Sequence, residues 1–335
     1  MIMEKMKEKI DGIVLYSGGL DSILAYKLLD MQGLRVVALK NYSIFFPLKT
    51  SPEEYAQDQK DRFDVDIQIR DVTRQYEKIV RKPRFGYGRW MNPCLDCKLF
   101  MYMQAAELMK EKKARFIATG EVVGQRPMTQ HKSELNRLEK EAGLRGYVLR
   151  PLSARLLKPT EAENSGLVDR SRLLDISGRS RKSQMQLARD MGIENYPSPA
   201  GGCLLTDDTF ARRLKDMHIY GNDTRVLPLL LTGRHFRLSE TCRLIVGRNH
   251  EENQAIESHA ENADALLMPI SHMGPIAIVC GSCAEDKLET ATGIVARYGD
   301  AKPGEKTVVE IRTSGETSEK NCDAVSNDII DKLRI

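Results

Sequence analysis

Tyr16-Ser17-Gly18-Gly19-Leu20-Asp21-Ser22 is the stretch that best predicts the fold of this 335-residue chain. It follows the apolar run Gly12 to Tyr16 and precedes a segment in which Leu24 and Leu28 lie on one helical face. A buried strand, a glycine-rich turn and a helix are therefore expected in that order. Such a turn directs several backbone N–H groups, and the positive end of a helix dipole, at one spot that can hold phosphate.

This turn differs from the two commonest phosphate-binding motifs. Gly304-Glu305-Lys306-Thr307 lacks the earlier glycine of a P-loop, and no G-x-G-x-x-G follows a strand. The remaining pattern, S-G-G-x-D-S after a strand, resembles the signature of the ATP pyrophosphatase (PP-loop) superfamily. That resemblance implies cleavage of ATP between its α and β phosphates and adenylation of a carbonyl oxygen. An ordinary strand-to-helix turn is the alternative. The loop residues implied at the nucleotide are Ser17, Gly18, Gly19, Asp21 and Ser22, with Asp21 also counted as catalytic.

Length and composition indicate a globular protein of two domains. The first ten residues are charged and lack the apolar region of a secretory signal, and no apolar run approaches the length of a membrane span. We therefore expect a cytoplasmic protein with no membrane partner. Seven cysteines then argue against disulfides, and they favour metal or redox chemistry wherever cysteines cluster.

The net charge of +4 is unevenly distributed along the chain. From Arg126 to Arg189 there are 14 Lys or Arg against 7 Asp or Glu, which makes this window the best candidate for contact with a polyanion. A solvated face of mixed charge is the alternative. The residues expected to contact RNA are Gln125, Arg126, Arg150, Arg179, Arg181 and Lys182.

Apolar runs and helical patterns alternate after the first turn, as they do in a parallel sheet. Ligands of such sheets bind at the carboxyl ends of the strands, so Lys40, Asn41 and Gly120 are expected beside the nucleotide. An aromatic and arginine-rich loop at 81–91 could clamp a base or simply pack on the surface. Strands are expected at 12–16, 35–40, 65–69, 116–119 and 147–149, and helices at 49–62 and 72–80.

Three cysteines provide the second chemical signal. Cys94 and Cys97 fall in the predicted first turn of a helix, after a capping Asn92, where the dipole and Lys98 favour thiolates. Cys203 follows a rigid Pro- and Gly-rich approach. A structural zinc site would need a fourth ligand. Two interpretations remain. In the one we favour, the three thiolates hold a [4Fe-4S] cluster whose fourth iron is free to carry sulfide. In the other, Cys203 carries a persulfide, and a second cysteine releases the sulfur by forming a disulfide with Cys203.

Three further motifs strengthen the resemblance and narrow it. They resemble the adenylation domain of tRNA 4-thiouridine synthases over residues 12–214, and the related tRNA 2-thiouridylases share the architecture and the paired cysteines. The chain departs from those synthases by lacking their RNA-binding extension and rhodanese domain, and by an insertion at about 156–174. The motifs are Ala118-Thr119-Gly120-Glu121 with Gly124-Gln125, then Leu149-Arg150-Pro151-Leu152, then Leu187-Ala188-Arg189-Asp190-Met191-Gly192.

The resemblance implies ATP-dependent thiolation of a tRNA uridine, with 4-thiouridine favoured over 2-thiouridine. ATP and Mg²⁺ would be the cofactors beside the optional cluster. The sulfur donor would be a cysteine desulfurase, a persulfide carrier or free sulfide, and a homodimer is compatible with the sequence. The rival functions are an ATP-dependent small-molecule sulfurtransferase or amide ligase, and a non-enzymatic RNA-binding factor.

The second half of the chain resembles the RNA-binding domain of the NFACT ribosome quality-control factors. Leu244-Ile245-Val246-Gly247-Arg248-Asn249 and Ala296–Lys302 carry this resemblance, although Leu266–His272 replaces the family's Trp-His strand. The predicted class is thus α/β: a Rossmann-like parallel sheet of the adenine nucleotide alpha hydrolase type with a smaller C-terminal α/β domain. Domains are expected at 1–215 and 222–312, with a polar, largely disordered tail at 313–335. Cys280 and Cys283 form a second C-x-x-C, expected to be buried or at a domain edge.

Overall fold

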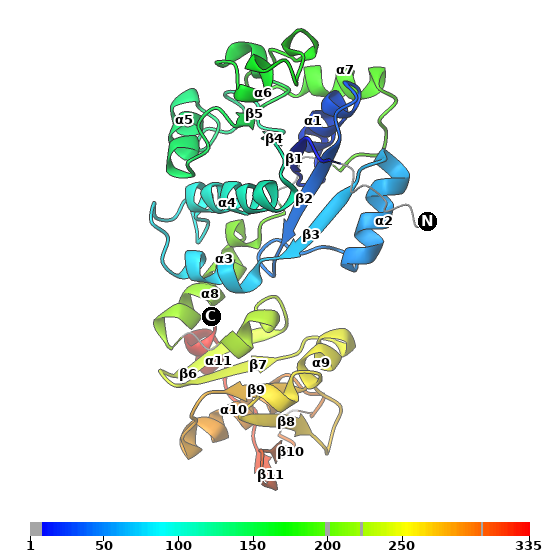
Figure 1. The fold of residues 1–335 in the computed structure, drawn as a ribbon. Helices are drawn as coiled ribbons and strands as arrows, with labels where there is room; N and C mark the ends of the chain where they lie inside the picture. Colours follow the sequence, from blue (N-terminus) through cyan, green and yellow to red (C-terminus); the bar gives the residue numbers. More distant parts are fainter. Residues whose placement is uncertain (1–8, 198–201, 222–223, 303) are drawn as a thin grey trace, which may run out of the picture. The chain divides into compact units, whose positions relative to one another are not determined.

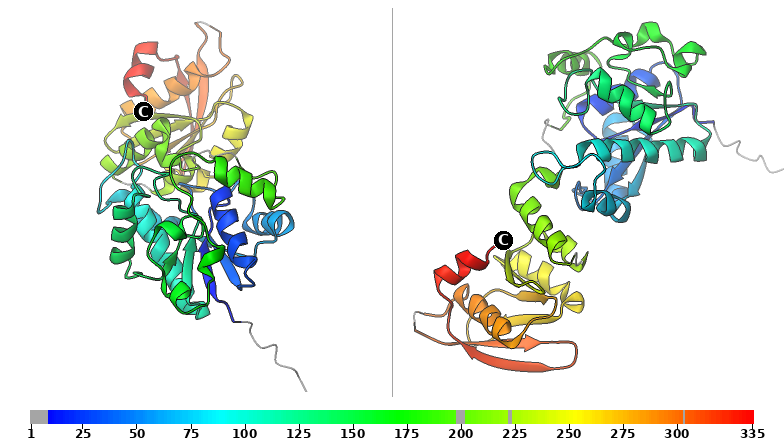
Figure 2. Two further views of the ribbon diagram at one scale, coloured as in Figure 1. Left: turned by 90° about the horizontal axis from the view of Figure 1, so that it is seen from above. Right: turned by 90° about the vertical axis from the view of Figure 1, so that its left-hand side faces the viewer.

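The computed structural model describes residues 9–197, 202–221, 224–302 and 304–335. The chain forms two compact units, and the boundary between them lies between Cys203 and Leu204. In Figures 1 and 2 the ribbon is coloured along the sequence, from blue at the N-terminus to red at the C-terminus. Helix α8 (Asp208–Ile219) therefore lies in the second unit, although the sequence-based domain boundaries place most of it in the first. Within the described ranges, no helix combines the length and apolar character needed to cross a membrane.

Five parallel strands form the sheet of the first unit, in the order β3-β2-β1-β4-β5. Every strand predicted for this half is present, because each apolar run is short and is bounded by turn residues. The predicted Rossmann-like α/β class is confirmed. The strands are β1 (Gly12–Leu15), β2 (Val36–Tyr42), β3 (Ile67–Asp71), β4 (Phe116–Thr119) and β5 (Val148–Leu149).

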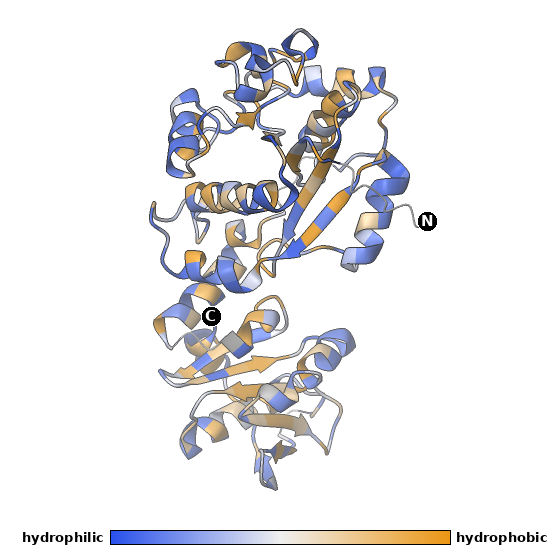
Figure 3. Ribbon diagram, in the orientation of Figure 1, coloured by the Kyte–Doolittle hydropathy of each residue, from blue (hydrophilic) through white to orange (hydrophobic). Residues whose placement is uncertain are grey.

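Helices cover both faces of this sheet, and alternate strand residues point to each face. Val14 and Ala118 pack on the face of α1 (Leu20–Asp30), α2 (Pro52–Phe63) and α7 (Lys182–Asp190). Ile13 and Ile117 pack on the face of α4 (Cys94–Lys112) and α5 (Lys132–Glu141). Figure 3 shows the hydrophobic strands between the more polar helices. The carboxyl ends of the strands are thus left free for a site.

Shorter elements complete the first unit. Helix α3 (Thr73–Arg81) precedes the predicted loop, which contains neither helix nor strand between residues 82 and 91. The insertion at 156–174 folds as the short helices α6 (Glu161–Asn164) and η2 (Arg170–Arg172) after η1 (Ala154–Leu156). Helix α5 has no counterpart in the prediction, because only Leu135 and Leu138 are buried on it.

The second unit is built on an antiparallel sheet of six strands in the order β11-β10-β8-β9-β7-β6. Helix α10 (Glu285–Arg297) packs on one face of this sheet together with α11 (Asn327–Leu333), the red helix of Figure 2. Helix α9 (His250–Glu257) contacts β7 and β9. The strands are β6 (Arg234–Ser239), β7 (Cys242–Val246), β8 (Ala265–Pro269), β9 (Ala277–Cys280), β10 (Thr307–Arg312) and β11 (Thr317–Cys322).

The prediction of disorder between residue 312 and the short helical pattern at 328–335 is wrong, whereas that helical pattern corresponds to α11. Residues 317–322 form β11, which pairs with β10 along its full length. This strand is polar because it lies at the sheet edge and is mostly exposed, so it lacks the apolar alternation by which strands are predicted. Ile330 of α11 is buried in the core of the same unit. The tail is therefore part of the fold.

The expectation of seven reduced cysteines is also wrong in one place. Cys242 and Cys283 form a disulfide, with their Cα atoms 5.0 Å apart. The pairing follows from the sheet: Arg243 lies opposite Cys280, so the turn after β9 brings Cys283 back beside Cys242. Cys280 is buried, as predicted, and is not part of the disulfide. Spacing in the sequence could not reveal this pair, because its members are 41 residues apart.

Candidate active site

The turn between β1 and α1 is closed by its own two serines. The hydroxyl of Ser17 lies 3.2 Å from that of Ser22 and accepts the N–H of Gly19 at 3.2 Å, while Ser22 donates to the carbonyl of Gly19 at 2.7 Å. Gly18 has a φ of +83°. Helix α1 then starts without a side-chain cap on its N-terminus. The N–H groups of Ser22 and Ile23 donate to the Gly19 carbonyl, which leaves those of Leu20 and Asp21 for an anion such as a phosphate.

Lys40 lies at this turn, as predicted from its place at the end of β2. Its Nζ donates to the carbonyl of Ser17 at 2.8 Å and is 5.4 Å from the ring centre of Tyr55. Burial lowers the pKa of Lys40 to about 8. Tyr55 of α2 completes this corner, since a Cβ on Gly18 would collide with its hydroxyl. Asn41 is turned toward α4, where its amide contacts the sulfur of Met101 at 3.1 Å.

The charge of Lys40 should make ATP binding depend on pH. The protonated amine attracts phosphate and predominates below its pKa of about 8, so ATP affinity should fall as the pH rises through 8 toward 9. We expect a loss of about tenfold between pH 7 and 9, measured by calorimetry at constant ionic strength. Lys40→Arg keeps its charge over this range and should remove most of the slope. An unchanged slope in that variant would assign the effect to another group.

Asp21 is held by residues of α7 and of the segment after β4. Its carboxylate accepts from Gln125 Nε2 at 2.8 Å and lies 3.5 Å from the guanidinium of Arg181. Gln184, fully buried on α7, donates in turn to Gln125 at 2.8 Å. Gln125 and Arg181, predicted to contact RNA, thus contact Asp21 instead. Gln184 has no signal in the sequence beyond its place in a predicted helix.

Gly120 and Glu121 join this turn to helix α4. A Cβ on Gly120 would lie 2.5 Å from the backbone of Asp21, so only glycine fits there. Glu121 is buried and lies 3.3 Å from Lys98 and 3.2 Å from Arg150. Burial raises its pKa, but Lys98 and Arg150 outweigh burial and bring the pKa of Glu121 down to about 2. A charged carboxylate therefore anchors the first turn of α4.

The prediction that Arg150 contacts RNA is wrong. Its side chain is 3% exposed and donates to Glu121 at 3.2 Å, to Glu139 at 2.5 Å and to the Tyr102 hydroxyl at 2.9 Å. The Arg-Pro-Leu motif places it inside the unit, where two carboxylates compensate its charge. Its role is therefore structural.

The three cysteines gather around one buried tyrosine of α3. The hydroxyl of Tyr76 lies against the thiol of Cys97, and Cys94 and Cys203 are close enough to act on it electrostatically. Burial, followed by these thiols, raises the pKa of Tyr76. The expectation of an activated thiolate at Cys97 is wrong, because desolvation raises its pKa despite the opposing effects of Tyr76 and Lys98. Asn92 contacts the sulfur of Cys94 through its amide at 3.2 Å rather than capping the helix.

These thiols are not arranged as a metal site. Within the part of the chain that the structure describes, no three His, Cys, Asp or Glu side chains are grouped so as to hold a metal ion. Three sulfurs are a suitable donor set for an iron-sulfur cluster, but here the Tyr76 hydroxyl is hydrogen-bonded to the Cys97 thiol. In this arrangement Cys97 is not free to ligate iron, so the three thiols do not fit a cluster.

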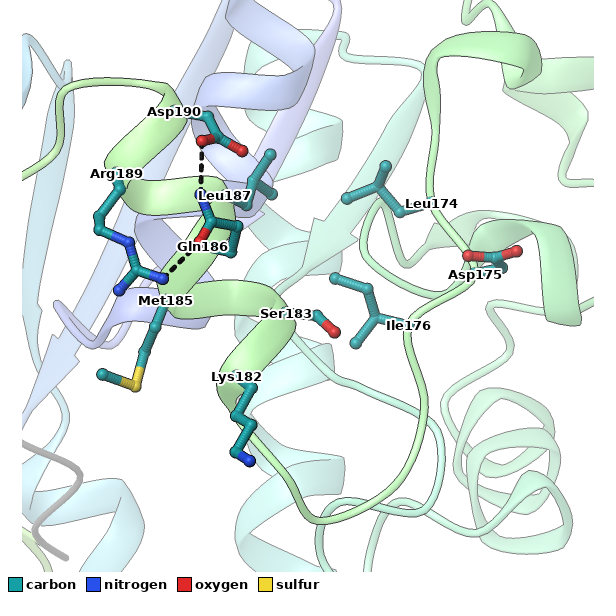
Figure 4. A pocket seen from close by; sticks show the side chains of 10 residues that line it. All are labelled: Leu174, Asp175, Ile176, Lys182, Ser183, Met185, Gln186, Leu187, Arg189 and Asp190. Carbon is teal, nitrogen blue, oxygen red and sulfur yellow. Dashed lines mark hydrogen bonds between the residues drawn. The ribbon is translucent and has the colours of Figure 1, made fainter.

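Three of the predicted RNA-contacting residues, Arg126, Arg179 and Lys182, are exposed. Lys182 lines an open groove of about 730 Å³ between α7 and residues 174–176, drawn in Figure 4. Along this groove Gln186 donates to Asp190 and accepts from Arg189. The lining comes from α7 and residues 174–176 rather than from the Ser17–Ser22 turn. No residue of the Ser17–Ser22 turn lines the groove. On α7 the lining begins at Lys182, which follows Arg181, a residue that contacts Asp21.

Comparison with known proteins gives two family matches. Residues 11–162 match the tRNA methyl transferase HUP domain, and residues 233–332 match the NFACT protein RNA binding domain. Both resemblances predicted from the sequence are thereby confirmed, and the second match extends through β11 and α11. No curated protein matches the chain. The two matches fall in the two compact units of the chain, one in each.

The solved structures that match the chain share little sequence with it. A predicted subunit of a tRNA methyltransferase from Methanocaldococcus jannaschii is 14% identical, over 55% of this chain and 90% of that one, with a TM-score of 0.31. The U34-tRNA thiolase NcsA from Methanococcus maripaludis with its [4Fe-4S] cluster is 17% identical, over 67% and 71%, with a TM-score of 0.37. A glutamine-dependent NAD+ synthetase from Acinetobacter baumannii bound to ADP is 19% identical, over 41% and 23%, with a TM-score of 0.26.

Proposed function

We propose that this chain, which joins a PP-loop HUP domain to an NFACT-type RNA-binding unit, is an ATP-dependent tRNA thiolase. One observation carries the proposal: the phosphate-binding turn and the cysteines are connected by direct contacts. Gly120 packs on the backbone of Asp21 and Ser22, the adjacent Glu121 pairs with Lys98, and Lys98 follows Cys97. In this proposal, the site that splits ATP and the site that carries sulfur share one edge of the sheet.

In the first proposed step, a uridine carbonyl oxygen attacks the α phosphate of ATP and releases pyrophosphate. The N–H groups of Leu20 and Asp21 would hold the phosphates at this turn, and Lys40 would add a positive charge beside them. Asp21 would orient Mg²⁺ or phosphate, with Gln125 and Arg181 fixing its carboxylate. The step produces an adenylated base from which AMP can depart.

In the second proposed step, sulfur displaces AMP at the same carbon. With a persulfide on Cys203, its outer sulfur attacks the carbon and AMP leaves. A thiolate of Cys97 or Cys94 then attacks the Cys203 sulfur, which frees the thiocarbonyl and forms a disulfide between the two cysteines. A thiol reductant must return two electrons before the next turnover. Were a [4Fe-4S] cluster bound, Cys94, Cys97 and Cys203 would hold it and it would supply sulfide, and Cys97 would have to give up its contact with the Tyr76 hydroxyl.

Tyr76→Phe should separate sulfur transfer from adenylation. The hydroxyl lowers the pKa of the Cys97 thiol, which desolvation has raised, so its loss should raise that pKa further. The thiolate then forms only at higher pH, and the alkaline rise of the thiolation rate should move to higher pH. Pyrophosphate release should keep its wild-type pH profile. A purely structural role would instead lower both rates without moving either profile.

The proposal is tested by analysing tRNA nucleosides from cells that lack the gene. Mass spectrometry should reveal the loss of one thiolated uridine, with 4-thiouridine expected ahead of 2-thiouridine, and the wild-type chain should restore it. In vitro, purified protein should release pyrophosphate from ATP only when tRNA is present. Iron content and electronic absorption of anaerobically purified protein then decide between cluster and persulfide. Unaltered tRNA nucleosides after deletion would refute the proposal.

A further inference from the structure

We infer that the second unit contains an oxyanion site between α8 and the sheet, built by Arg237 and Arg243 and suited to a single phosphate group. This inference concerns the NFACT-type unit alone and does not depend on thiolation. It accounts for a group of buried positive charges that the proposed reaction leaves unused.

The sheet register brings the two arginines together. Arg237 of β6 lies directly opposite Arg243 of β7, and Arg243 lies opposite Cys280 of β9. Directly opposed residues of antiparallel strands project from the same face. The neighbouring row of Phe236, Leu244 and Val279 belongs to the core on the other face. The arginines therefore project toward α8, where the guanidinium of Arg243 bonds the carbonyl of Arg213 at 3.1 Å.

Arg243 carries a buried charge that its surroundings only partly compensate. It is 2% exposed, and its Nε and Nη1 atoms have no hydrogen-bond acceptor among the described residues. Asp216 of α8 lies 3.7 Å from Nη1, but its carboxylate is engaged by Arg237 at 2.5 and 3.1 Å. Desolvation lowers the pKa of Arg243 to about 10. A buried guanidinium with free N–H groups is stabilised when an anion accepts from them.

A cavity of about 70 Å³ lies at these arginines, lined also by Thr241, Cys280 and Gly281. This is room for several water molecules or one small tetrahedral oxyanion. The Thr241 hydroxyl lies at an exposed position of the rim and donates its one proton to the Ser282 carbonyl at 2.7 Å, so the arginines are the donors of the site. Tyr220, which is 41% exposed, lies with its ring 4.8 Å from the guanidinium of Arg237. The cavity is thus bordered by an aromatic ring that a nucleotide base could stack on.

The chemistry favours phosphate as the ligand. Arginine pairs readily with phosphate through parallel N–H bonds, and one anion would neutralise the excess of positive charge left by Asp216. Phosphate could come from an RNA strand or from solution. The match of residues 233–332 to an RNA-binding domain favours the RNA source, in which case a phosphate at the end of a strand would enter the cavity most easily.

The test uses the full-length protein with two probes. Inorganic phosphate is titrated by calorimetry against chloride of equal ionic strength, and short RNAs with a 5′-phosphate, a 3′-phosphate or only hydroxyl ends are compared by fluorescence anisotropy. Arg243→Met and Arg237→Gln should each weaken phosphate binding about tenfold or more, the usual worth of charge-assisted hydrogen bonds. Arg237→Gln guards against misfolding, because it leaves the buried Arg243 in place and frees Asp216 to neutralise it.

Arg312→Gln is the matched control, since this arginine of β10 is half-exposed and does not line the cavity. It should bind phosphate like the wild type. Competition between inorganic phosphate and an end-phosphorylated RNA would assign the site to RNA, and binding of phosphate without competition would assign it to the free anion. Phosphate binding that is absent from the wild type, or equal in both folded variants, would overturn the inference.

Discussion

Asp21→Ala is expected to reduce tRNA-dependent release of pyrophosphate at least a hundredfold, with thiouridine formation falling in parallel. The carboxylate begins α1 in the turn where the phosphates are proposed to bind, and Gln125 and Arg181 hold it in one orientation. Removing one preorganised group that acts on developing charge commonly lowers a rate by about this factor. The measurement is pyrophosphate release from ATP in the presence of tRNA.

Asp30→Ala provides the control for the Asp21 variant. Asp30 ends the same helix and pairs with Lys27 at 3.2 Å on the surface, so its loss should leave the rate of pyrophosphate release unchanged. Circular dichroism and thermal melting show whether either variant has lost its fold. Full pyrophosphate release by a folded Asp21→Ala protein would remove Asp21 from the proposed chemistry.

Unlike Asp21→Ala, which should stop both steps, Cys203→Ala should stop only the transfer of sulfur. Thiouridine formation should fall to background, whereas tRNA-dependent pyrophosphate release should stay within about twofold of wild type, because only the second step loses its sulfur carrier. Adenylated tRNA should then accumulate or be hydrolysed to AMP without sulfur incorporation. Single-turnover assays with radiolabelled ATP and mass spectrometry of the nucleosides measure both steps.

Cys322→Ser is the matched variant for Cys203. Cys322 is a free cysteine of the second unit whose thiol donates to the Thr307 carbonyl at 3.3 Å, a bond that serine can retain. Its replacement should not affect either step. Normal thiolation by Cys203→Ala would contradict the role proposed for the three cysteines. Loss of pyrophosphate release in that variant would mean instead that Cys203 supports the ATP site.

The elements that position the site could be predicted because they depend on short-range patterns. Each strand of the parallel sheet is an apolar run between turn residues, and the glycine-rich turn after Leu15 specifies its own geometry. The predicted positions of Lys40 and Gly120 followed from the rule that ligands meet the carboxyl ends of parallel strands. Both residues contact the turn in the structure.

Other features could not be predicted because they depend on which segments meet in space. Tyr55 and Gln184 look like ordinary helix residues until packing brings them to the turn and to Gln125. Arg150 was assigned to RNA on charge alone, yet Glu121 and Glu139 draw it into the interior. Tyr76 carries no motif, although it lies at the centre of the three cysteines. The sequence shows which functional groups a chain has, and the tertiary structure determines which of them contact each other.

The buried pairing of Glu121 with Lys98 also bears on how quickly the two proposed steps can follow each other. Glu121 follows Gly120, which packs on the Ser17–Ser22 turn, and Lys98 belongs to α4, the helix that begins with Cys94 and Cys97. The pair therefore fixes the turn and the thiols to one another inside a single unit. An activated base would then wait only for side chains to rearrange, within nanoseconds, and not for the microsecond-to-millisecond closure of whole domains. Water would have correspondingly little time to intercept the adenylated intermediate before sulfur arrives.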